Sequence, residues 1–182
     1  MIHPLADVKS KKIGADTTVW QFTVVLEGAS IGNNCNINCH NFIENDVVIG
    51  NNVTVKSGVY LWDGIEISDN VFIGPGVLFT NDKFPRSKQY PASFQKTKIG
   101  NNASIGAGTT IMGGIKIGEY ALIGAASLVT RDVPAHALVM GHPAVIKGWV
   151  DKKGNKLTAS GSKWISIDGE EFIVENDLLK KL

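Results

Sequence analysis

The stretch from Ile31 to Ile67 decides the fold. It reads IGNNCNINCHNFIENDVVIGNNVTVKSGVYLWDGIEI and carries an aliphatic residue at every sixth position. The same spacing extends back to Ile13 and forward to Phe79. Neither an α-helix nor a pleated strand repeats every six residues. A coil of three short parallel strands does, because each group of six residues supplies one strand and one corner. The chain is therefore predicted to be all-β and to form a parallel β-helix.

Other positions of the repeat support this prediction. Glycine often follows the aliphatic residue, and Asn pairs follow it at 33–34, 51–52 and 101–102; both residue types tolerate the left-handed backbone of tight corners. A β-sandwich of short strands is the alternative, but it would not keep a period of six through twelve consecutive repeats. The fourth residue after the aliphatic one is usually small or β-branched, as a narrow prism requires, for example Val53, Val59, Val71, Val77, Ala103, Thr109, Ala121 and Ser127.

One interruption divides the repeats. Residues 80–98, TNDKFPRSKQYPASFQKTK, contain two prolines and five basic residues, and the six-residue spacing resumes at Ile99. This segment is expected to leave the prism as a loop, which either carries function or is a solvated insertion with no role. Residues 1–147 are predicted to form the β-helix domain with its extruded loop. Residues 148–182 alternate in polarity around Asp168-Gly169, which favours a C-terminal β-hairpin extension.

Composition narrows the possible partners. The 182 residues include 18 basic and 17 acidic side chains, for a net charge of +1. This balance argues against nucleic acid or an anionic membrane surface as the main partner. The N-terminal residues lack a signal-peptide core, and no run approaches the ~20 apolar residues of a membrane span, so a cytoplasmic location is expected. Cys35 and Cys39 are too few for a disulfide scaffold and are interpreted as small core or wall residues.

The repeats, the extruded loop and the run RDVPAHALVMGHPAVIKG at 131–148 together resemble the hexapeptide-repeat acyltransferases. The segments HNFIENDVVIG, VYLWDGIEI, VFIGPGVLFTND and FPRS resemble those members that N-acetylate dTDP-linked 3-amino-3,6-dideoxyhexoses; related enzymes act on UDP-linked 3-amino sugars. The resemblance implies a left-handed β-helix, acetyl-CoA as co-substrate and no metal. It also implies a homotrimer with active sites between subunits, where the loop reaches a neighbour. The product would serve surface polysaccharide, O-antigen or S-layer glycan synthesis, and the sugar can have the glucose or galactose configuration.

His40 is the candidate catalytic residue. Acyl transfer to an amine needs a placed nucleophile, a donor for the developing oxyanion and an acceptor for the amine proton. His40 is the one histidine of four that lies within the coils, beside a corner, so its ring is expected to face outward. Imidazole titrates near neutral pH and suits the role of general base. The alternative is a surface imidazole or a hydrogen-bonding partner of the substrate.

A second mechanism needs no protein base. The thiolate leaving group would take the amine proton, and polar residues would hold the amine in place. Asn81 and Asp82, where the chain leaves the prism, could then accept hydrogen bonds from the amino group or a neighbouring hydroxyl. The Asn-Asp pair can equally be explained as the start of a turn.

Further substrate contacts are expected on one corner of the prism. Glu44 and Trp62 follow repeats one coil apart, so Glu44, Trp62, Asp63, Asn81 and Asp82 should gather there. Trp62 can stack on a pyrimidine or pack against a neighbouring subunit, and packing is favoured. In the loop, Arg86 offers a forked donor for pyrophosphate, helped by Lys83 and Lys88, unless these are only solvated charges.

The family resemblance places coenzyme A along the later coils. Small residues at Gly106-Ala107 and Gly124-Ala125 would let the pantetheine arm approach the backbone, and Arg131 and Lys147 would lie near its phosphates. The same glycines and alanines can equally be explained by the needs of the corners alone.

The same residues argue against two other classes of function. A zinc hydratase on this prism would need about three groove-facing histidines, and only His40 qualifies. A non-catalytic β-helix would need neither the extruded loop nor the segment that ends the coils. Among enzymes, the alternative to the dTDP-linked sugar is a UDP-linked 3-amino sugar or another small amine.

Overall fold

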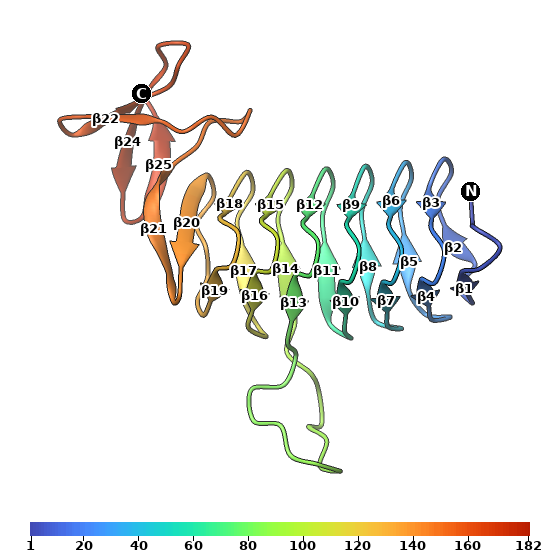
Figure 1. Ribbon diagram of the computed structural model, residues 1–182. Coiled ribbons are helices and arrows are strands. Elements are labelled where there is room, and N and C mark those ends of the chain that lie inside the picture. The colour runs from blue at the N-terminus through green and yellow to red at the C-terminus, as the bar shows by residue number, and fades with distance from the viewer.

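The computed structural model describes residues 1–182, and Figure 1 shows a stack of short coils with one long loop and a small sheet at the C-terminal end. All regular elements are strands. The chain contains no helix long and apolar enough to cross a membrane. The predicted all-β parallel β-helix is confirmed.

Three parallel sheets form the walls of the prism. Sheet A contains β3 (Thr18–Val19), β6 (Asn36–Ile37), β9 (Thr54–Val55), β12 (Phe72–Ile73), β15 (Ser104–Ile105), β18 (Leu122–Ile123), β20 (Ala137–Gly141) and, antiparallel at its end, β21 (Ala144–Trp149). Sheet B contains β1 (Asp7–Val8), β4 (Val24–Val25), β7 (Phe42–Ile43), β10 (Tyr60–Leu61), β13 (Leu78–Phe79), β16 (Thr110–Ile111) and β19 (Leu128–Val129). Sheet C contains β2 (Lys12–Ile13), β5 (Ser30–Ile31), β8 (Val48–Ile49), β11 (Ile65–Ile67), β14 (Thr97–Ile99) and β17 (Lys116–Ile117).

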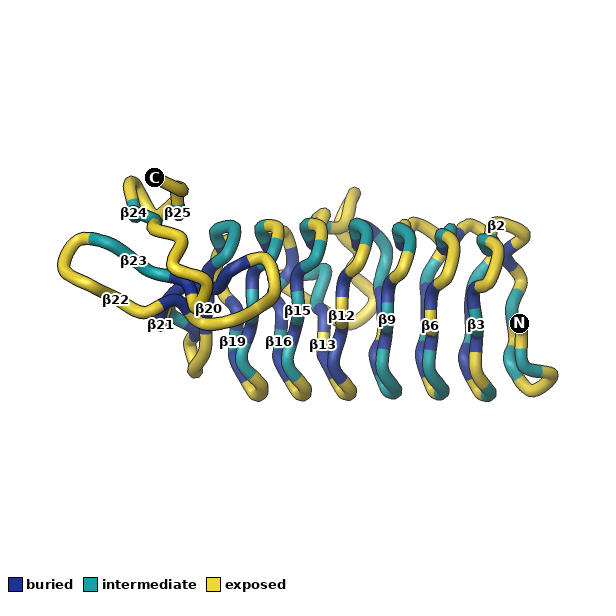
Figure 2. Tube along the Cα trace, turned by 90° about the horizontal axis from the view of Figure 1, so that it is seen from above, coloured by how far each residue is buried: buried dark blue, intermediate teal, exposed yellow.

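The core is the column of side chains that the six-residue repeat points inward. Ile43 pairs with Val25 on one side and Leu61 on the other, each 18 residues away, so three repeats close one coil. Val25, Ile43 and Leu61 have no exposed surface. The buried positions form a continuous band along the interior of the stack, seen in dark blue in Figure 2. Each buried aliphatic side chain contributes about 1.5–3 kcal/mol relative to an exposed one.

The corners correct one sequence prediction. The glycines that directly follow the aliphatic residues do not adopt the left-handed backbone. Positive φ falls two residues later, for example at Asn34 (53°) and Asn52 (56°). Gly32 is required for a different reason: a Cβ there would lie 2.5 Å from the carbonyl oxygen of Gly50 in the next coil. The stacked coils approach so closely at this place that only glycine fits.

The extruded loop lies between β13 and β14, and its last two predicted residues belong to a strand. β14 begins at Thr97 because Thr97 pairs with Ile65 and Lys98 pairs with Glu66 in β11. The loop therefore spans 80–96. The coils resume on the next wall in order, since β13 belongs to sheet B and β14 to sheet C.

The C-terminal end departs from the coils. The predicted domain boundary at 147/148 falls inside β21, because Trp149 pairs with Ala137 of β20. A fourth, antiparallel sheet follows, so the region after β21 has more strands than the predicted hairpin. It packs Trp164, Phe172, Val174 and Leu179 against the main core. Its strands are β22 (Thr158–Ser160), β23 (Lys163–Ile165), β24 (Glu171–Glu175) and β25 (Leu178–Lys181).

Candidate active site

His40 occupies a corner between β6 of sheet A and β7 of sheet B. Its backbone is left-handed, with φ of 60°, and its side chain is exposed. The imidazole stacks on the ring of Phe22 from the preceding coil, with centroids 5.1 Å apart and an interplanar angle of 27°. Outside glycine, this backbone region costs roughly 1–2 kcal/mol. Three later coils place glycine at the same corner position, at Gly58, Gly76 and Gly108. Phe22 and Ala126 occupy the same position in two further coils, with φ of 61° and 56°, so a side chain is tolerated there at this cost.

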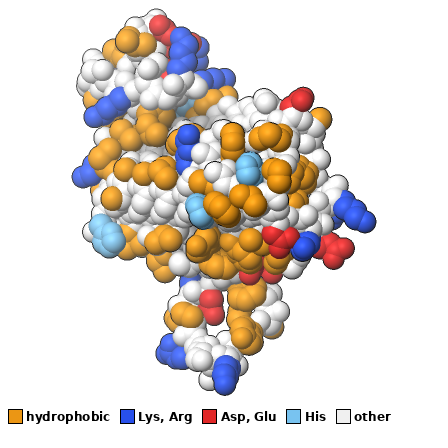
Figure 3. Space-filling model, turned by 45° about the vertical axis from the view of Figure 1, so that its right-hand side comes forward, with side chains coloured by type: hydrophobic (Ala, Val, Ile, Leu, Met, Phe, Trp, Pro, Cys, Tyr) orange, Lys and Arg blue, Asp and Glu red, His pale blue; other side chains and the backbone are white.

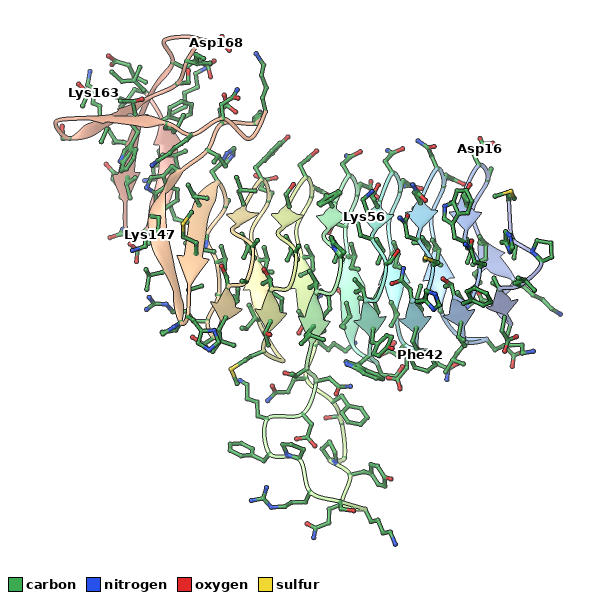
Figure 4. The ribbon with its side chains drawn as sticks, in the orientation of Figure 1. Asp16, Phe42, Lys56, Lys147, Lys163 and Asp168 are labelled. Carbon is green, nitrogen blue, oxygen red and sulfur yellow. The ribbon has the colours of Figure 1, made fainter.

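A groove with an aromatic wall lies beside His40. Its volume is about 440 Å³, and five of its seven lining residues are apolar. The rings of Phe42, Tyr60 and Trp62 lie 5.8–6.5 Å apart, centroid to centroid, and form the wall on the outer surface of sheet B. Phe42 lies on the side of the stack from which the loop leaves (Figure 4), and hydrophobic side chains cover the body directly above that loop (Figure 3). The full lining is Phe22, Val24, His40, Asn41, Phe42, Tyr60 and Trp62.

A polar network lies at the opposite edge of sheet B, on the corner that leads to sheet C. The Glu44 carboxylate accepts a hydrogen bond from the backbone N–H of Asp63 at 2.7 Å. The Asn81 side-chain amide donates to the carbonyl oxygen of Asp63 at 3.4 Å. The Trp62 indole N–H donates to the carbonyl oxygen of Phe79 at 2.9 Å. The structure thus links three of the five predicted corner residues, Glu44, Asp63 and Asn81, through the backbone of Asp63, whereas the Trp62 indole bonds to Phe79 beside them.

The remaining predicted substrate residues stand apart from this network. The Asp82 carboxylate accepts from the backbone N–H of Phe84 at 2.8 Å, which is the bond of a turn-forming aspartate. The Arg86 guanidinium donates to the carbonyl oxygen of Pro85 at 2.9 Å. Arg86, Lys83 and Lys88 are exposed on the loop. Within one chain these cations have no contact with the corner that carries Glu44 and Asp63.

Several residues of the site escaped the sequence analysis. Phe42 and Tyr60 stand one coil apart in the same outward position, so the 18-residue phase could have found them. Gln95 gave no such signal, because it lies in the irregular loop. Its backbone N–H donates to the carbonyl oxygen of Asn81 at 3.2 Å and closes the base of the loop. Its side chain is half-buried, with the Oε1 atom buried beside Gly113 and Gly114.

The residues predicted to contact coenzyme A divide between different edges. Gly106, Ala107 and Ala125 lie on the corner between sheets A and B, the same edge as His40. Lys147 lies on β21, at the end of sheet A (Figure 4). Arg131 follows β19 on the other edge of sheet B. Sheet B therefore separates Arg131 from the small residues within one chain.

Packing accounts for one of these glycines. A Cβ at Gly106 would lie 2.5 Å from the backbone nitrogen of Ala125, so Gly106 is needed to stack two coils. A second set of glycines on this edge is different. A Cβ at Gly58, Gly76 or Gly108 would meet no atom within 4 Å, so these positions face open space. No side chain therefore projects from the edge at these three positions.

The two cysteines lie in and beside the wall, as their small size suggested. Cys35 is buried, and its thiol donates to the carbonyl oxygen of Gly50 at 3.1 Å. Burial raises the pKa of the Cys35 thiol above its ordinary value. The Cys39 sulfur lies 3.3 Å from the Ser57 hydroxyl. No group of three His, Cys, Asp or Glu side chains lies close enough together to hold a metal ion.

Comparison with known proteins agrees with the repeat. The model of the bacterial transferase hexapeptide family, built from six repeats, matches residues 46–81 and 96–131. A dTDP-3-amino-3,6-dideoxy-alpha-D-galactopyranose 3-N-acetyltransferase from Aneurinibacillus thermoaerophilus is 52% identical over 181 residues, covering 100% of this chain and 94% of the relative.

Two solved structures share the fold. A mutant of AntD, an N-acyltransferase from Bacillus cereus in complex with dTDP and coenzyme A, superposes with a TM-score of 0.63 at 21% identity, covering 84% of each chain. A hexapeptide-repeat acetyltransferase from Vibrio cholerae O1 biovar eltor in complex with acetyl coenzyme A superposes with a TM-score of 0.56 at 25% identity, covering 76% of this chain and 70% of that one.

The chain belongs to the hexapeptide-repeat acyltransferases. Within this family it is an N-acetyltransferase, on the strength of the relative that matches its whole length.

Proposed function

We propose that the protein transfers the acetyl group of acetyl-CoA to the 3-amino group of a dTDP-linked 3-amino-3,6-dideoxyhexose, with the galactose configuration as the first choice. The observation that carries the proposal is the 52% identity, over the whole chain, with an enzyme named for that reaction. The acetylated sugar would serve a surface polysaccharide, O-antigen or S-layer glycan, and the reaction would take place in the cytoplasm.

His40 is assigned the role of general base. An amine must lose a proton as it attacks the thioester carbonyl, and a positioned base contributes typically 10²–10⁴-fold to the rate. Two facts support the assignment: the imidazole is exposed, and it is held against the ring of Phe22 beside the groove. The groove beside it has an aromatic wall that excludes water from one side of the reacting groups.

Glu44, Asp63 and Asn81 are assigned to the sugar, with Trp62 fixed beside them. Hydrogen bonds to the backbone of Asp63 hold the Glu44 carboxylate and the Asn81 amide at one edge of sheet B, where a hydroxylated substrate could bind. The Asp63 carboxylate accepts from the backbone N–H of Asp46 at 2.7 Å. Asp82 and Arg86 would join the site only when the loop meets a partner. In the alternative mechanism these same groups hold the amine, and the departing thiolate takes its proton.

Acetyl-CoA is assigned to the edge between sheets A and B. Gly58, Gly76 and Gly108 face open space there, and the last of them lies three coils from His40, ~14 Å at the usual strand spacing. A thin pantetheine arm could follow this edge with its thioester at His40. Ala107 and Ala125 lie on the same edge, and Lys147 lies toward its far end, where the phosphates would be.

A homotrimer is part of the proposal. The loop carries Phe84 and Tyr90, which are 84% and 83% exposed in a single chain. Large aromatic rings so exposed favour contact with another surface. Sheet B offers such a surface, since its outward side chains include Phe42, Tyr60 and Leu78. Association through this face would bring the loop of one subunit over the groove of another and would add Arg86 to the site.

The test is thiol release from acetyl-CoA with matched acceptors. dTDP-3-amino-3,6-dideoxygalactose, its glucose epimer and a UDP-linked 3-amino sugar are each compared with an acceptor-free blank. The proposal expects the highest kcat/KM with the dTDP-galactose compound. A higher kcat/KM with the glucose epimer would mean that the substrate has the glucose configuration. A higher kcat/KM with the UDP-linked sugar would mean that the nucleotide is UDP. Absence of thiol release with all three compounds would show that nucleotide-linked 3-amino sugars of these types are not the acceptor.

A further inference from the structure

Asn41, which directly follows His40, has no role in the reaction as described so far. Its side chain is buried, with 2% of its surface exposed. Both ends of its carboxamide are hydrogen-bonded to backbone. The Nδ2 group donates to the carbonyl oxygen of Asn38 at 2.8 Å, within the same corner. The Oδ1 atom accepts from the N–H of Val59 at 2.7 Å, in the next coil.

The preceding coil adds a third hydrogen bond to the same corner. The Thr23 hydroxyl donates to the carbonyl oxygen of Asn38 at 2.7 Å, so this oxygen accepts two side-chain hydrogen bonds. The corner 38–41 is thus bonded to the coil on either side and across its own turn. His40 is the left-handed residue inside that turn. The hydrogen bonds therefore fix the backbone from which the imidazole projects.

Equivalent corners show that closing a coil does not require this arrangement. The places corresponding to Asn41 are held by Val59 and Val77 in the next two coils, where glycine takes the left-handed position. A related set of bonds recurs at the corner 124–127. There the Thr109 and Ser127 hydroxyls both donate to the carbonyl oxygen of Gly124. That corner has Ala126 in the left-handed position. The corner 20–23 also carries a side chain there, Phe22, but its Thr23 hydroxyl donates to the next coil and not across its own turn. The bonds thus occur at two of the three corners that carry a side chain in the left-handed position.

We propose that Asn41 is a positioning residue for His40: its carboxamide holds the turn so that the imidazole keeps one orientation against the groove. The inference rests on the proposed function, in which His40 accepts the amine proton. Phe22 contacts the face of the ring, and Asn41 fixes its backbone. Because proton transfer needs hydrogen-bond geometry, a displacement of about 1 Å costs on the order of 10²-fold in rate.

The main test variant is Asn41→Val. Valine fits this place in the coil, since Val59 and Val77 occupy it in the next two coils. The matched control is Thr17→Val, on the corner between sheets C and A. The Thr17 hydroxyl also makes two hydrogen bonds to backbone, donating to the carbonyl oxygen of Gly32 and accepting from the N–H of Cys35. Val53 shows that valine is tolerated at the corresponding place there.

Turnover, KM for both substrates and melting temperature are measured for each variant, alone and combined with His40→Ala. We expect both valine variants to lower the melting temperature similarly. Asn41→Val alone should lower kcat about 10- to 100-fold while each KM stays within about twofold. In the His40→Ala background Asn41→Val should have no further effect on kcat, because the group it positions is gone.

Each other outcome decides against a stated claim. An Asn41→Val enzyme with unchanged kcat, or with the same fold loss in both backgrounds, overturns the positioning role and leaves His40 as the base. Normal turnover of His40→Ala overturns the base itself, and the role of Asn41 falls with it. If the valine variant does not fold, Asn41→Asp replaces it, since a carboxylate there can accept from the Val59 N–H but cannot donate to the carbonyl oxygen of Asn38. Aspartate therefore lacks the bond within the turn, so an intermediate kcat is expected, and full activity contradicts the inference.

Discussion

Sheets B and C have the same type of residue on their inward face, but they differ in the residues of their outward face. Inward, both are lined by fully buried aliphatic side chains, such as Ile43 and Ile49. Outward, sheet B carries Val24, Phe42, Tyr60, Leu78, Thr110 and Leu128 after its first strand, whereas sheet C carries Lys12, Ser30, Val48, Glu66, Lys98 and Lys116. Sheet C also holds an exposed ion pair between Glu66 and Lys98, 2.7 Å apart, of the kind that contributes little to stability. The difference shows that the inward residues make the fold, and the outward residues are free to make a site.

The largest expected effect concerns the edge of sheet B. His40→Ala should lower kcat by about 10²–10⁴-fold with little change in KM, because a transition-state role is removed. Its matched control is Asn102→Ala, which also has positive φ, 60°, but lies on the corner between sheets C and A. Steady-state kinetics of both variants give the result. Equal turnover in the two would show that His40 has no chemical role and would favour the mechanism without a base.

Inward substitutions test whether the walls are truly equivalent. Ile43→Ala in sheet B and Ile49→Ala in sheet C should each destabilise the protein by about 2–5 kcal/mol, since both leave a cavity in the same column. Urea unfolding of the two variants, followed by circular dichroism, measures the midpoints. A large difference between them would mean that outward contacts on one wall contribute to its stability.

Outward substitutions test whether the walls differ in association. Tyr60 and Val48 are almost equally exposed in one chain, at 47% and 48%. Tyr60→Lys should weaken self-association, because a charge would enter an apolar contact face, and Val48→Lys should leave association unchanged. Light scattering after size-exclusion chromatography distinguishes trimer from monomer. The opposite result would place the contact on sheet C.

The smallest expected effect lies outside the walls, where the chain passes to the fourth sheet. Burial alone would raise the pKa of Asp151, but hydrogen bonds from Asn155 and from the backbone of Lys153 outweigh it and lower the pKa below its usual value. The carboxylate therefore stabilises the fold above its unfolded pKa of ~3.9 and loses this contribution as the pH falls through the folded value.

Asp151→Ala should cost about 1–2 kcal/mol at neutral pH and progressively less in acid. Melting temperatures of wild type and variant, measured from pH 7 to pH 3, give the comparison. A constant difference across this range would show that the charge contributes nothing, and only the shape of the turn matters.

The sequence predicted the part of the site that lies on the coils better than the part that lies on the loop. The 18-residue phase correctly grouped Glu44, Trp62, Asp63 and Asn81, because equal spacing along the chain becomes adjacency along the stack. It missed Gln95, since the loop has no repeat from which to count. The family resemblance, not the phase, grouped Arg131 with Gly106 and Ala125 as contacts of one ligand. Sheet B lies between them within one chain, and the grouping stays a prediction. The left-handed backbone predicted for the glycines that directly follow the aliphatic residues was also wrong, because close approach of two coils is a property of the stack and not of one turn.

The sequence by itself determined the prism, its three walls, the exit of the loop and the family, because each follows from a local period or from motifs that are read directly. Tertiary structure decided which side chains meet. Phe22 lies against His40, and Asn41 bonds to the next coil, only because residues about 18 apart are brought face to face when the coils stack. Residues 18 apart do not constrain each other in the unfolded chain, and they meet only after the hydrophobic core has stacked the coils. The orientation of the imidazole is therefore a property of the folded stack.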